Sequence, residues 1–329
     1  MKRRNWAWDE MAGSRSLYVY AIPYVIISSL QYPFAKDGLR YADPLTFMAL
    51  RYLIAAFATF VFARSFKPRF NRDTILLSLF TAISTLLWIY GLQGVSPAQS
   101  AVLSYTMPLF AIPLTAIVLK ERASRLAWVG TLVGFAGVVV YGVTLAGSGM
   151  SLFGGILTVG NSVFWALFTI YYRKTKNQDA ATTVGTQLLI GGVLFTVFMP
   201  ITFAVTVTPE FLMDLGYVSI VSGFGVFYLW SAMLRREKVG KVTTLAFAVP
   251  AVTTLIETVQ TGEVPGPATL GGIAIMFLGI YISRFHEIRE TGDEPAGGEG
   301  RQDGISVPST GHKEPEMGSR MSRSFESND

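Results

Sequence analysis

The residues best suited to chemistry in this sequence are a few charged side chains within long apolar stretches. Glu257 and Arg51 each lie several residues inside such a stretch, and Lys36 lies at the end of another. A charge at the centre of a bilayer costs about 2.5–3.5 kcal/mol on insertion scales, so its presence indicates a function or a buried partner. A carboxyl group at Glu257 could exchange a proton with solvent and couple that exchange to another process.

Each of these charged residues also has a structural interpretation. Glu257 could form a local hydrogen bond or reach the membrane surface, and Lys36 is favoured as an ordinary interfacial lysine. Arg51 lies at a depth similar to that of Glu257, so it could pair with Glu257, contact a bound molecule or serve helix packing. We take Glu257 and Arg51 as the candidate coupling residues.

Composition excludes several kinds of catalytic and metal site. The chain has no cysteine, and its two histidines, His286 and His312, both follow the last apolar stretch. Disulfides, thiolate ligands, histidine-ligated zinc and a Ser-His-Asp triad within the membrane are therefore ruled out. The sequence also lacks a Gly-x-x-x-x-Gly-Lys-Ser/Thr loop for ATP. We expect no catalytic residue, no metal and no cofactor, which disfavours an enzyme.

Polar and aromatic residues within the apolar stretches form a second group of candidates. Aromatic surfaces with a few hydrogen-bonding groups suit a neutral or zwitterionic small molecule. Helix packing and interfacial aromatic belts are the alternative interpretation. The candidate binding residues are Gln31, Tyr32, Ser84, Trp88, Ser104, Tyr105, Asn161, Trp165, Tyr228, Trp230, Thr243 and Thr244.

The elements that must position these residues are predicted to be membrane-spanning helices. The chain is 51% hydrophobic and only 15% charged, and a spanning helix needs about 20 mostly apolar residues. Stretches of that kind lie near 17–35, 45–63, 73–92, 97–119, 126–146, 152–172, 182–205, 211–233, 241–260 and 266–284. The sequence therefore predicts an all-α integral membrane protein with ten transmembrane helices.

The positive charges alternate between the two sides of the predicted membrane. Lys and Arg cluster in the N-terminal tail 1–16, in every second loop and after the tenth stretch, whereas the opposite loops carry only Lys36 and Arg40. The positive-inside rule places both termini in the cytoplasm. The acidic, Gly- and Pro-containing segment 285–329 is predicted to be a disordered cytoplasmic tail. The basic charge thus reflects topology, and we expect no nucleic-acid partner.

The two halves of the chain repeat at an offset of 142 residues. Repeat-equivalent residues include the pairs Trp88 and Trp230, Pro108 and Pro250, Glu121 and Glu263, Gly130 and Gly272, and Gly137 and Gly279. Each half, 17–146 and 152–284, contains an odd number of spans, so the halves enter the bilayer from opposite sides. Such inverted repeats are typical of secondary transporters, which bind their substrates where the halves meet.

Prolines and glycines within the spans suggest where helices bend and where they approach closely. Pro108 and Pro250 are predicted hinge residues, with a static kink as the alternative. Gly130, Gly137 and Gly272 allow close helix contact. We favour packing within the fold for these glycines and leave a homodimer interface open.

Several motifs together resemble a known family. They are the run 88–92 (Trp-Ile-Tyr-Gly-Leu), the run 96–101 (Ser-Pro-Ala-Gln-Ser-Ala), Pro108, Leu119 to Glu121 and the segment between Gly130 and Gly137, with counterparts in the second half. This pattern, over roughly 15–284, resembles the EamA repeat of the drug/metabolite transporter superfamily. Ser28 stands where that family often has Trp. The resemblance implies ten helices, cytoplasmic termini and a central cavity lined mainly by spans 1, 3, 4, 6, 8 and 9.

The combined interpretation is a secondary transporter in the cell (inner or plasma) membrane. It is expected to move a small metabolite, an amino acid or a similar molecule, by alternating access. Export is favoured, with proton coupling through Glu257 as a hypothesis. The expected partners are the small-molecule substrate and membrane lipid. A non-transporting membrane sensor or scaffold is the alternative, and a membrane-embedded enzyme is a less favoured one.

Overall fold

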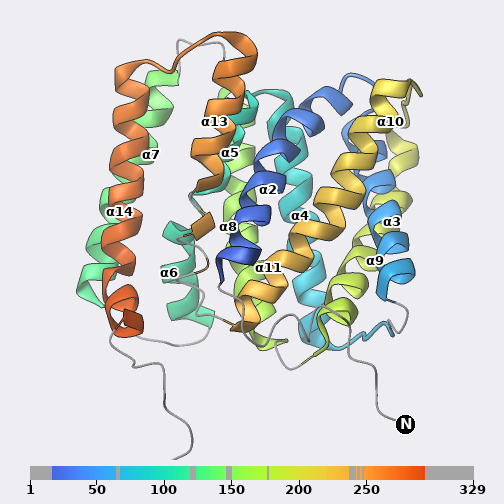
Figure 1. Cartoon of the computed structure of the whole chain (residues 1–329), viewed down its shortest axis with the longest axis horizontal. Helices are drawn as coiled ribbons and strands as arrows, with labels where there is room; N and C mark the ends of the chain where they lie inside the picture. The colour runs from blue at the N-terminus through green and yellow to red at the C-terminus, as the bar shows by residue number, and fades with distance from the viewer. Residues whose placement is uncertain are drawn as a thin grey trace, which may run out of the picture. The chain divides into compact units, whose positions relative to one another are not determined.

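The structure is a computed structural model that describes residues 17–63, 67–118, 124–145, 150–175, 178–236, 242, 245–246 and 248–292. This part of the chain is helical and holds no β-strand, only an isolated antiparallel bridge between Ala42 and Val205. The prediction of an all-α fold is therefore confirmed. The elements (Figure 1) are α2 (Tyr18–Gly38), α3 (Pro44–Ala63), α4 (Arg72–Gln93), α5 (Pro97–Ser104), α6 (Met107–Val118), α7 (Arg125–Leu145), α8 (Leu152–Lys174), α9 (Ala180–Phe198), η1 (Met199–Ile201), α10 (Pro209–Gly216), η2 (Tyr217–Phe224), α11 (Gly225–Arg236), α13 (Ala248–Thr261) and α14 (Pro267–Gly292).

Seven helical segments in the described residues are long and apolar enough to cross a membrane. They are Pro44–Phe62, Arg72–Gln93, Pro97–Val118, Arg125–Thr144, Leu152–Lys174, Ala180–Ile201 and Pro209–Arg236. Helices α2, α13 and α14 also follow predicted apolar stretches, but length and hydropathy alone do not identify them as crossing helices. The chain is thus a multi-pass membrane protein, and seven of its described helical segments qualify as crossings by length and composition.

The helix starts follow the local sequence. Asn71 caps α4 by accepting a hydrogen bond from the Thr74 N–H, and Ser96 forms a reciprocal capping box with Gln99 at the start of α5. Such side chains satisfy amide groups that have no partner in the first turn of a helix. Helix α14 continues to Gly292, past the predicted end near 284, so residues 285–292 of the segment predicted to be disordered are helical. The tail residues 1–16 and 293–329 lie outside the described residues.

The helices pack in pairs that join distant parts of the sequence. Helix α4 packs along α8, α3 packs along α9, and α2 contacts both α11 and α13. Buried hydroxyl groups on these helices, such as those of Ser78 and Thr81, donate to the carbonyl four residues earlier. Large apolar side chains including Phe57 and Phe60 are exposed on the outside. The bundle therefore has small polar groups inside and an apolar surface suited to lipid.

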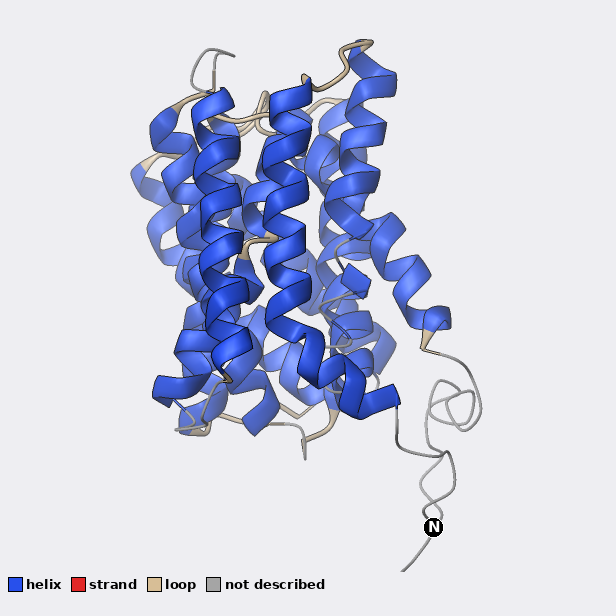
Figure 2. Cartoon of the chain, turned by 90° about the vertical axis from the view of Figure 1, so that its left-hand side faces the viewer, coloured by secondary structure: helices blue, strands red, loops and turns tan. Residues whose placement is uncertain are grey.

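Glycines bring α7 and α14 into close contact on one side of the bundle, the side that faces the viewer in Figure 2. A Cβ atom at Gly137 would meet the backbone of Met276 and the Gly272 carbonyl, and one at Gly130 would meet the backbone of Ser283 and the Gly279 carbonyl. Close backbone contact of this kind requires small residues. The glycines flagged in the sequence thus pack within the chain.

One predicted span is broken and another is irregular. The stretch expected as one helix over 97–119 is two helices, α5 and α6, separated by Tyr105 and Thr106. Thr106 Oγ1 donates to the Leu103 carbonyl at 2.7 Å, and Pro108 occupies the first turn of α6, where no amide donor is needed. Between α10 and α11 the helix η2 makes a π-helical segment, a form often found at functional sites.

Candidate functional site

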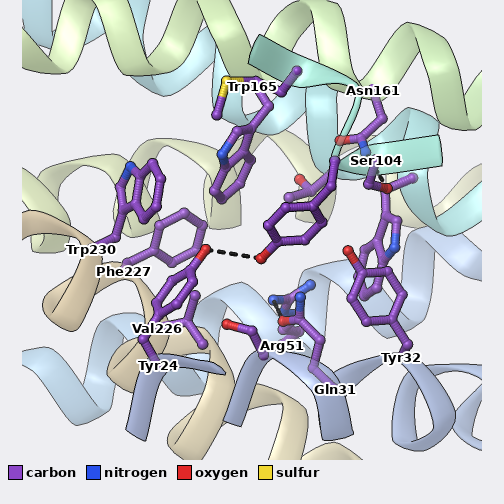
Figure 3. Close-up of a pocket in the computed structure, with 15 residues that line it drawn as sticks. Tyr24, Gln31, Tyr32, Arg51, Ser104, Asn161, Trp165, Val226, Phe227 and Trp230 are labelled. Atoms are coloured by element: carbon purple, nitrogen blue, oxygen red, sulfur yellow. Dashed lines mark hydrogen bonds between the residues drawn. The ribbon is translucent and has the colours of Figure 1, made fainter. Parts of the chain in front are cut away.

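A small cavity lies between α2, α3, α4, the α5–α6 break, α8 and α11. Its volume is about 60 Å³, which accommodates a few water molecules, since about 10–15 Å³ suffices for one. Nine of the residues singled out in the sequence meet in its wall, from helices far apart along the chain (Figure 3). These are Gln31, Tyr32, Arg51, Trp88, Ser104, Tyr105, Asn161, Trp165 and Trp230.

Other predicted binding residues lie elsewhere. Tyr228 is outside the cavity wall, with its ring 5.7 Å from the Phe224 ring. It precedes Trp230 by two residues, which is about 200° around a helix, so the two cannot share a face. Ser84 lies behind the wall, where its hydroxyl donates to Asn161 Oδ1 at 2.6 Å. Thr243 and Thr244 lie outside the described residues.

The structure adds wall residues that the sequence interpretation missed. Tyr24 and Ser28 share the face of α2 that carries Gln31 and Tyr32, at the spacing i, i+4, i+7 and i+8 that defines one side of a helix. That polar stripe within an apolar helix was the signal that could have identified them. The other additional wall residues are Thr85, Met107, Val226 and Phe227.

Arg51 occupies the polar end of the cavity. Its Nη2 donates to Gln31 Oε1 at 3.4 Å, and its guanidinium carbon lies 5.1 Å from the centre of the Trp88 ring. Gln31 Oε1 also accepts a hydrogen bond from Ser222 of the π-helical segment η2. Arg51 Nε and Nη1 are buried and have no hydrogen-bond partner. The guanidinium is therefore stacked on Trp88 and bonded to Gln31, while two of its nitrogens are buried without a partner.

The opposite end of the cavity is aromatic. Figure 3 shows Trp165, Phe227 and Trp230 gathered there, away from Arg51. The Tyr24 and Trp230 rings stack at 5.3 Å, and the Trp165 and Phe227 centroids lie 5.7 Å apart. Between the two ends, the hydroxyl groups of Tyr24 and Tyr105 form a hydrogen bond of 3.1 Å. Aromatic rings thus line both ends of the wall, and the hydrogen-bonding groups are concentrated around Arg51 and its neighbour Trp88.

A larger, open cavity of about 550 Å³ lies at the end of α2 and α4, and we call it the vestibule. Lys36 and Glu257 line it, and both hold the corner between α4 and α5. Lys36 Nζ donates to the carbonyls of Leu92 at 2.6 Å and of Gln93 and Val95 at 3.0 Å. Glu257 Oε2 accepts the Ala98 N–H at 2.6 Å.

These positions decide one open alternative and correct one expectation. Arg51 and Glu257 line different cavities and do not form the pair suggested by their similar depth. Lys36 is more than an interfacial lysine, because its ammonium group satisfies the last carbonyls of α4. A cation is favourable at a helix C-terminus and an anion at a helix N-terminus. Lys36 of α2 therefore stabilises the end of α4, and Glu257 of α13 stabilises the start of α5.

Asp43 joins two loops at the same end of the bundle. Its carboxylate accepts hydrogen bonds from Thr202 Oγ1 at 2.6 Å, from the Ala204 N–H at 2.9 Å and from the Thr46 hydroxyl. Partial burial acts to raise the pKa of Asp43, but these hydrogen bonds together lower it. The loop after α2 is thus fastened to the loop after η1.

Comparison with known proteins gives the family. Residues 15–143 and 152–285 each match the EamA-like transporter family. The chain belongs to this family. It is 47% identical to an uncharacterized transporter from the sor 3' region of Acidianus ambivalens, over 73% of this chain and 94% of that protein. It is also 24% identical to a probable amino-acid metabolite efflux pump of Escherichia coli strain K12, over 83% of this chain and 96% of that protein.

A solved crystal structure has the same fold. It matches with a TM-score of 0.63 at 19% identity and covers 84% of this chain and 98% of that chain. The family membership and the seven apolar helices identify the chain as a membrane transporter of the EamA type.

Proposed function

We propose that this EamA-type transporter moves a small metabolite, an amino acid or a similar molecule, across the plasma membrane by alternating access, with export as the favoured direction. The observation that carries the proposal is the cavity between the two family-matched halves, lined by hydrogen-bonding groups around Arg51 and by a cluster of aromatic rings at the other end. Ligand pockets usually measure about 300–1,000 Å³. A cavity of about 60 Å³ therefore has to widen before a metabolite can enter.

Packing within the bundle supports an inverted repeat of five helices in each half. In the repeat, α4 of the first half is equivalent to α11 of the second, and α2 of the first half is equivalent to α8 of the second. The contact of α4 with α8 therefore has the contact of α11 with α2 as its counterpart, and both contacts are present. The glycine contacts between α7 and α14 show the same symmetry. Gly130 is equivalent to Gly272, and Gly137 is equivalent to Gly279. Gly130 contacts Gly279, and the counterpart of that contact, Gly137 with Gly272, is also present. Two halves related in this way supply two conformations of similar energy.

We further propose that α2, α13 and α14 complete ten membrane crossings with both termini in the cytoplasm. The basic loops on one side support this orientation. It places the vestibule, with Lys36 and Glu257, on the outer side. We propose that the α4–α5 corner, which Lys36 and Glu257 hold by hydrogen bonds, separates the vestibule from the cavity in a state closed toward the outside.

Glu257 is the proposed proton-coupling residue. Its carboxylate holds the Ala98 N–H at the start of α5, and a protonated carboxyl group would accept that hydrogen bond less strongly. Proton exchange would therefore loosen the α4–α5 corner. We expect Glu257→Gln to abolish flux driven by a pH gradient while counterflow without a gradient continues. Gradient-driven flux that is unchanged in the variant would contradict this role.

Counterflow in proteoliposomes tests the proposed function. Vesicles containing the purified chain are loaded with a pool of neutral and aromatic amino acids, and labelled members are added outside. Saturable accumulation above that in protein-free vesicles is the expected result. Ligand binding by folded, inserted protein without accumulation would favour a sensor and contradict transport.

A further inference from the structure

Arg51 is a charged group without a charged partner in the interior of the bundle. Only 4% of the residue is exposed, and no Asp or Glu in the described part of the chain forms an ion pair with it. Two of its nitrogens, Nε and Nη1, have no hydrogen-bond partner. Removing the partner of a buried charge is strongly destabilising in proteins, so a group that satisfies these donors is expected to enter the cavity.

We propose that Arg51 binds the carboxylate of the transported molecule, so that the substrate class is a small monocarboxylate with an apolar or aromatic body. This assignment deepens the proposed transport function and rests on it. Arginine is the residue best matched to carboxylates, because its planar group offers several charge-assisted donors.

The surroundings of Arg51 hold its donors in place. The Trp88 ring packs against the guanidinium at 5.1 Å, and Gln31 accepts from Nη2 at 3.4 Å. Ser222 in turn donates to Gln31 and fixes the amide oxygen toward Arg51. The side chain is thereby oriented before any ligand arrives, which reduces the entropy that binding must overcome.

The remainder of the wall defines the body of the ligand. Trp165, Phe227 and Trp230 at the opposite end favour an apolar or aromatic group. The described wall contains no second Lys or Arg for a phosphate dianion. A carboxylate, free or carried by an amino acid, is therefore the anionic group that this wall matches.

Thermal unfolding of the full chain in detergent tests the assignment without requiring flux. Three probes share a phenyl ring and differ at the polar end: phenylacetate, its neutral isostere phenylacetamide, and the cation phenethylamine. A ligand that binds only the folded state raises the midpoint temperature in a saturable manner. We expect phenylacetate to do so, with an apparent affinity about tenfold or more above those of the amide and the amine, as a charge-assisted hydrogen bond provides.

Variants identify the residue responsible for the preference. Arg51→Gln should lose the preference for acid over amide, and Arg51→Lys should retain part of it. Arg40→Gln is the matched control, because Arg40 is an exposed vestibule cation paired with Asp37, and it should leave the preference unchanged. If Arg51→Gln does not fold, the comparison of acid with amide on the unmodified chain still decides whether the cavity selects a carboxylate.

Three results would overturn the assignment: equal stabilisation by acid and amide, an acid preference that survives in Arg51→Gln, or no stabilisation by phenylacetate at any concentration. Failure of transport itself would look different. The acid preference would then persist in detergent while counterflow of the amino acids and of labelled phenylacetate stayed at the level of protein-free vesicles.

Discussion

At the scale of single residues, we expect Arg51 to serve binding rather than stability. A buried cation without a counterion contributes little to folding, and apolar replacements of buried ionic groups are often neutral or stabilising. We expect Arg51→Met to leave the ligand-free midpoint temperature equal to or above that of the unmodified chain, measured in the same detergent. A drop of several degrees would show that Arg51 acts in packing.

Ser84 is a positioning residue for the cavity. It donates to Asn161 Oδ1 at 2.6 Å, and Asn161 Nδ2 donates to Ser104 at 2.9 Å. Ser84→Ala leaves a buried amide oxygen short of a donor, which costs about 1–3 kcal/mol. Chemical unfolding should show a loss of that size. Ser84→Thr, which keeps the hydroxyl group, serves as the control, and equal stability of Ser84→Ala and the unmodified chain would contradict the role.

Asp43 should make the thermal stability of the fold depend on pH. Hydrogen bonds lower the folded-state pKa of Asp43 below its ordinary value of 3.8. The ionised Asp43 carboxylate therefore stabilises the fold fully above pH 3.8, and this stabilisation is lost as the pH falls through the lower folded-state pKa. Asp43→Asn should lower the midpoint temperature at pH 7 and converge with the unmodified chain under strong acid. Asp37→Asn, at an exposed position, is the control. A difference in midpoint temperature between Asp43→Asn and the unmodified chain that does not change with pH would refute the prediction.

Sequence reasoning located most of this site because polar and aromatic residues are rare within apolar spans. Arg51, Asn161 and Trp230 were identifiable on that ground alone and do line the cavity. Helix periodicity shows that Tyr228 and Trp230 cannot share a face, but which of them faces the cavity, and that Ser84 lies behind the wall, depends on how whole helices rotate and pack. Those features arise from tertiary contacts that a single sequence does not display.

At the scale of elements, α7 and α14 approach so closely that only glycine fits between them. A leucine at Gly137 would collide with the backbone of α14, whereas a Cβ atom at Gly142 on the same helix meets nothing within 4 Å. Overpacking costs about 1–3 kcal/mol or more. Gly137→Leu should therefore lower the midpoint temperature clearly, and Gly142→Leu should not. Equal effects of the two substitutions would argue against close packing of α7 on α14.

The α4–α5 corner is the element that we expect to open. Lys36→Met removes three hydrogen bonds to carbonyls there. The chain has no cysteine, so Ser28→Cys in the cavity wall is a clean reporter. A membrane-impermeant maleimide added from the vestibule side should label the cysteine of Ser28→Cys faster when Lys36→Met is also present. Arg40→Met should leave the labelling rate unchanged. An unchanged rate would show that Lys36 does not hold the corner closed.

Helix breaks were harder to predict than helix positions. The hydropathy pattern indicates where apolar residues lie, and the helices follow those ranges. It does not indicate that the chain stops being helical at Tyr105 and Thr106, because the break depends on Thr106 bonding to Leu103 and to Ser162 of another helix. Pro108 marked the region from sequence, and its role as a hinge, like that of Pro250, remains a prediction.

At the scale of the whole molecule, the proposed transport requires two halves that exchange roles. The repeat offset was visible in the sequence, and the crossed contacts of Gly130 with Gly279 and Gly137 with Gly272 agree with it. A bundle built in this way can expose one central cavity to either side by rearranging the halves against each other.

The most direct test is the accessibility of Ser28→Cys from both faces of the membrane. The variant is reconstituted in one known orientation, and an impermeant thiol reagent is applied outside or enclosed inside the vesicles. Alternating access predicts labelling from each side, with protection by a bound carboxylate in both cases. Labelling from one side only, with or without ligand, would contradict the account and identify a fixed pocket.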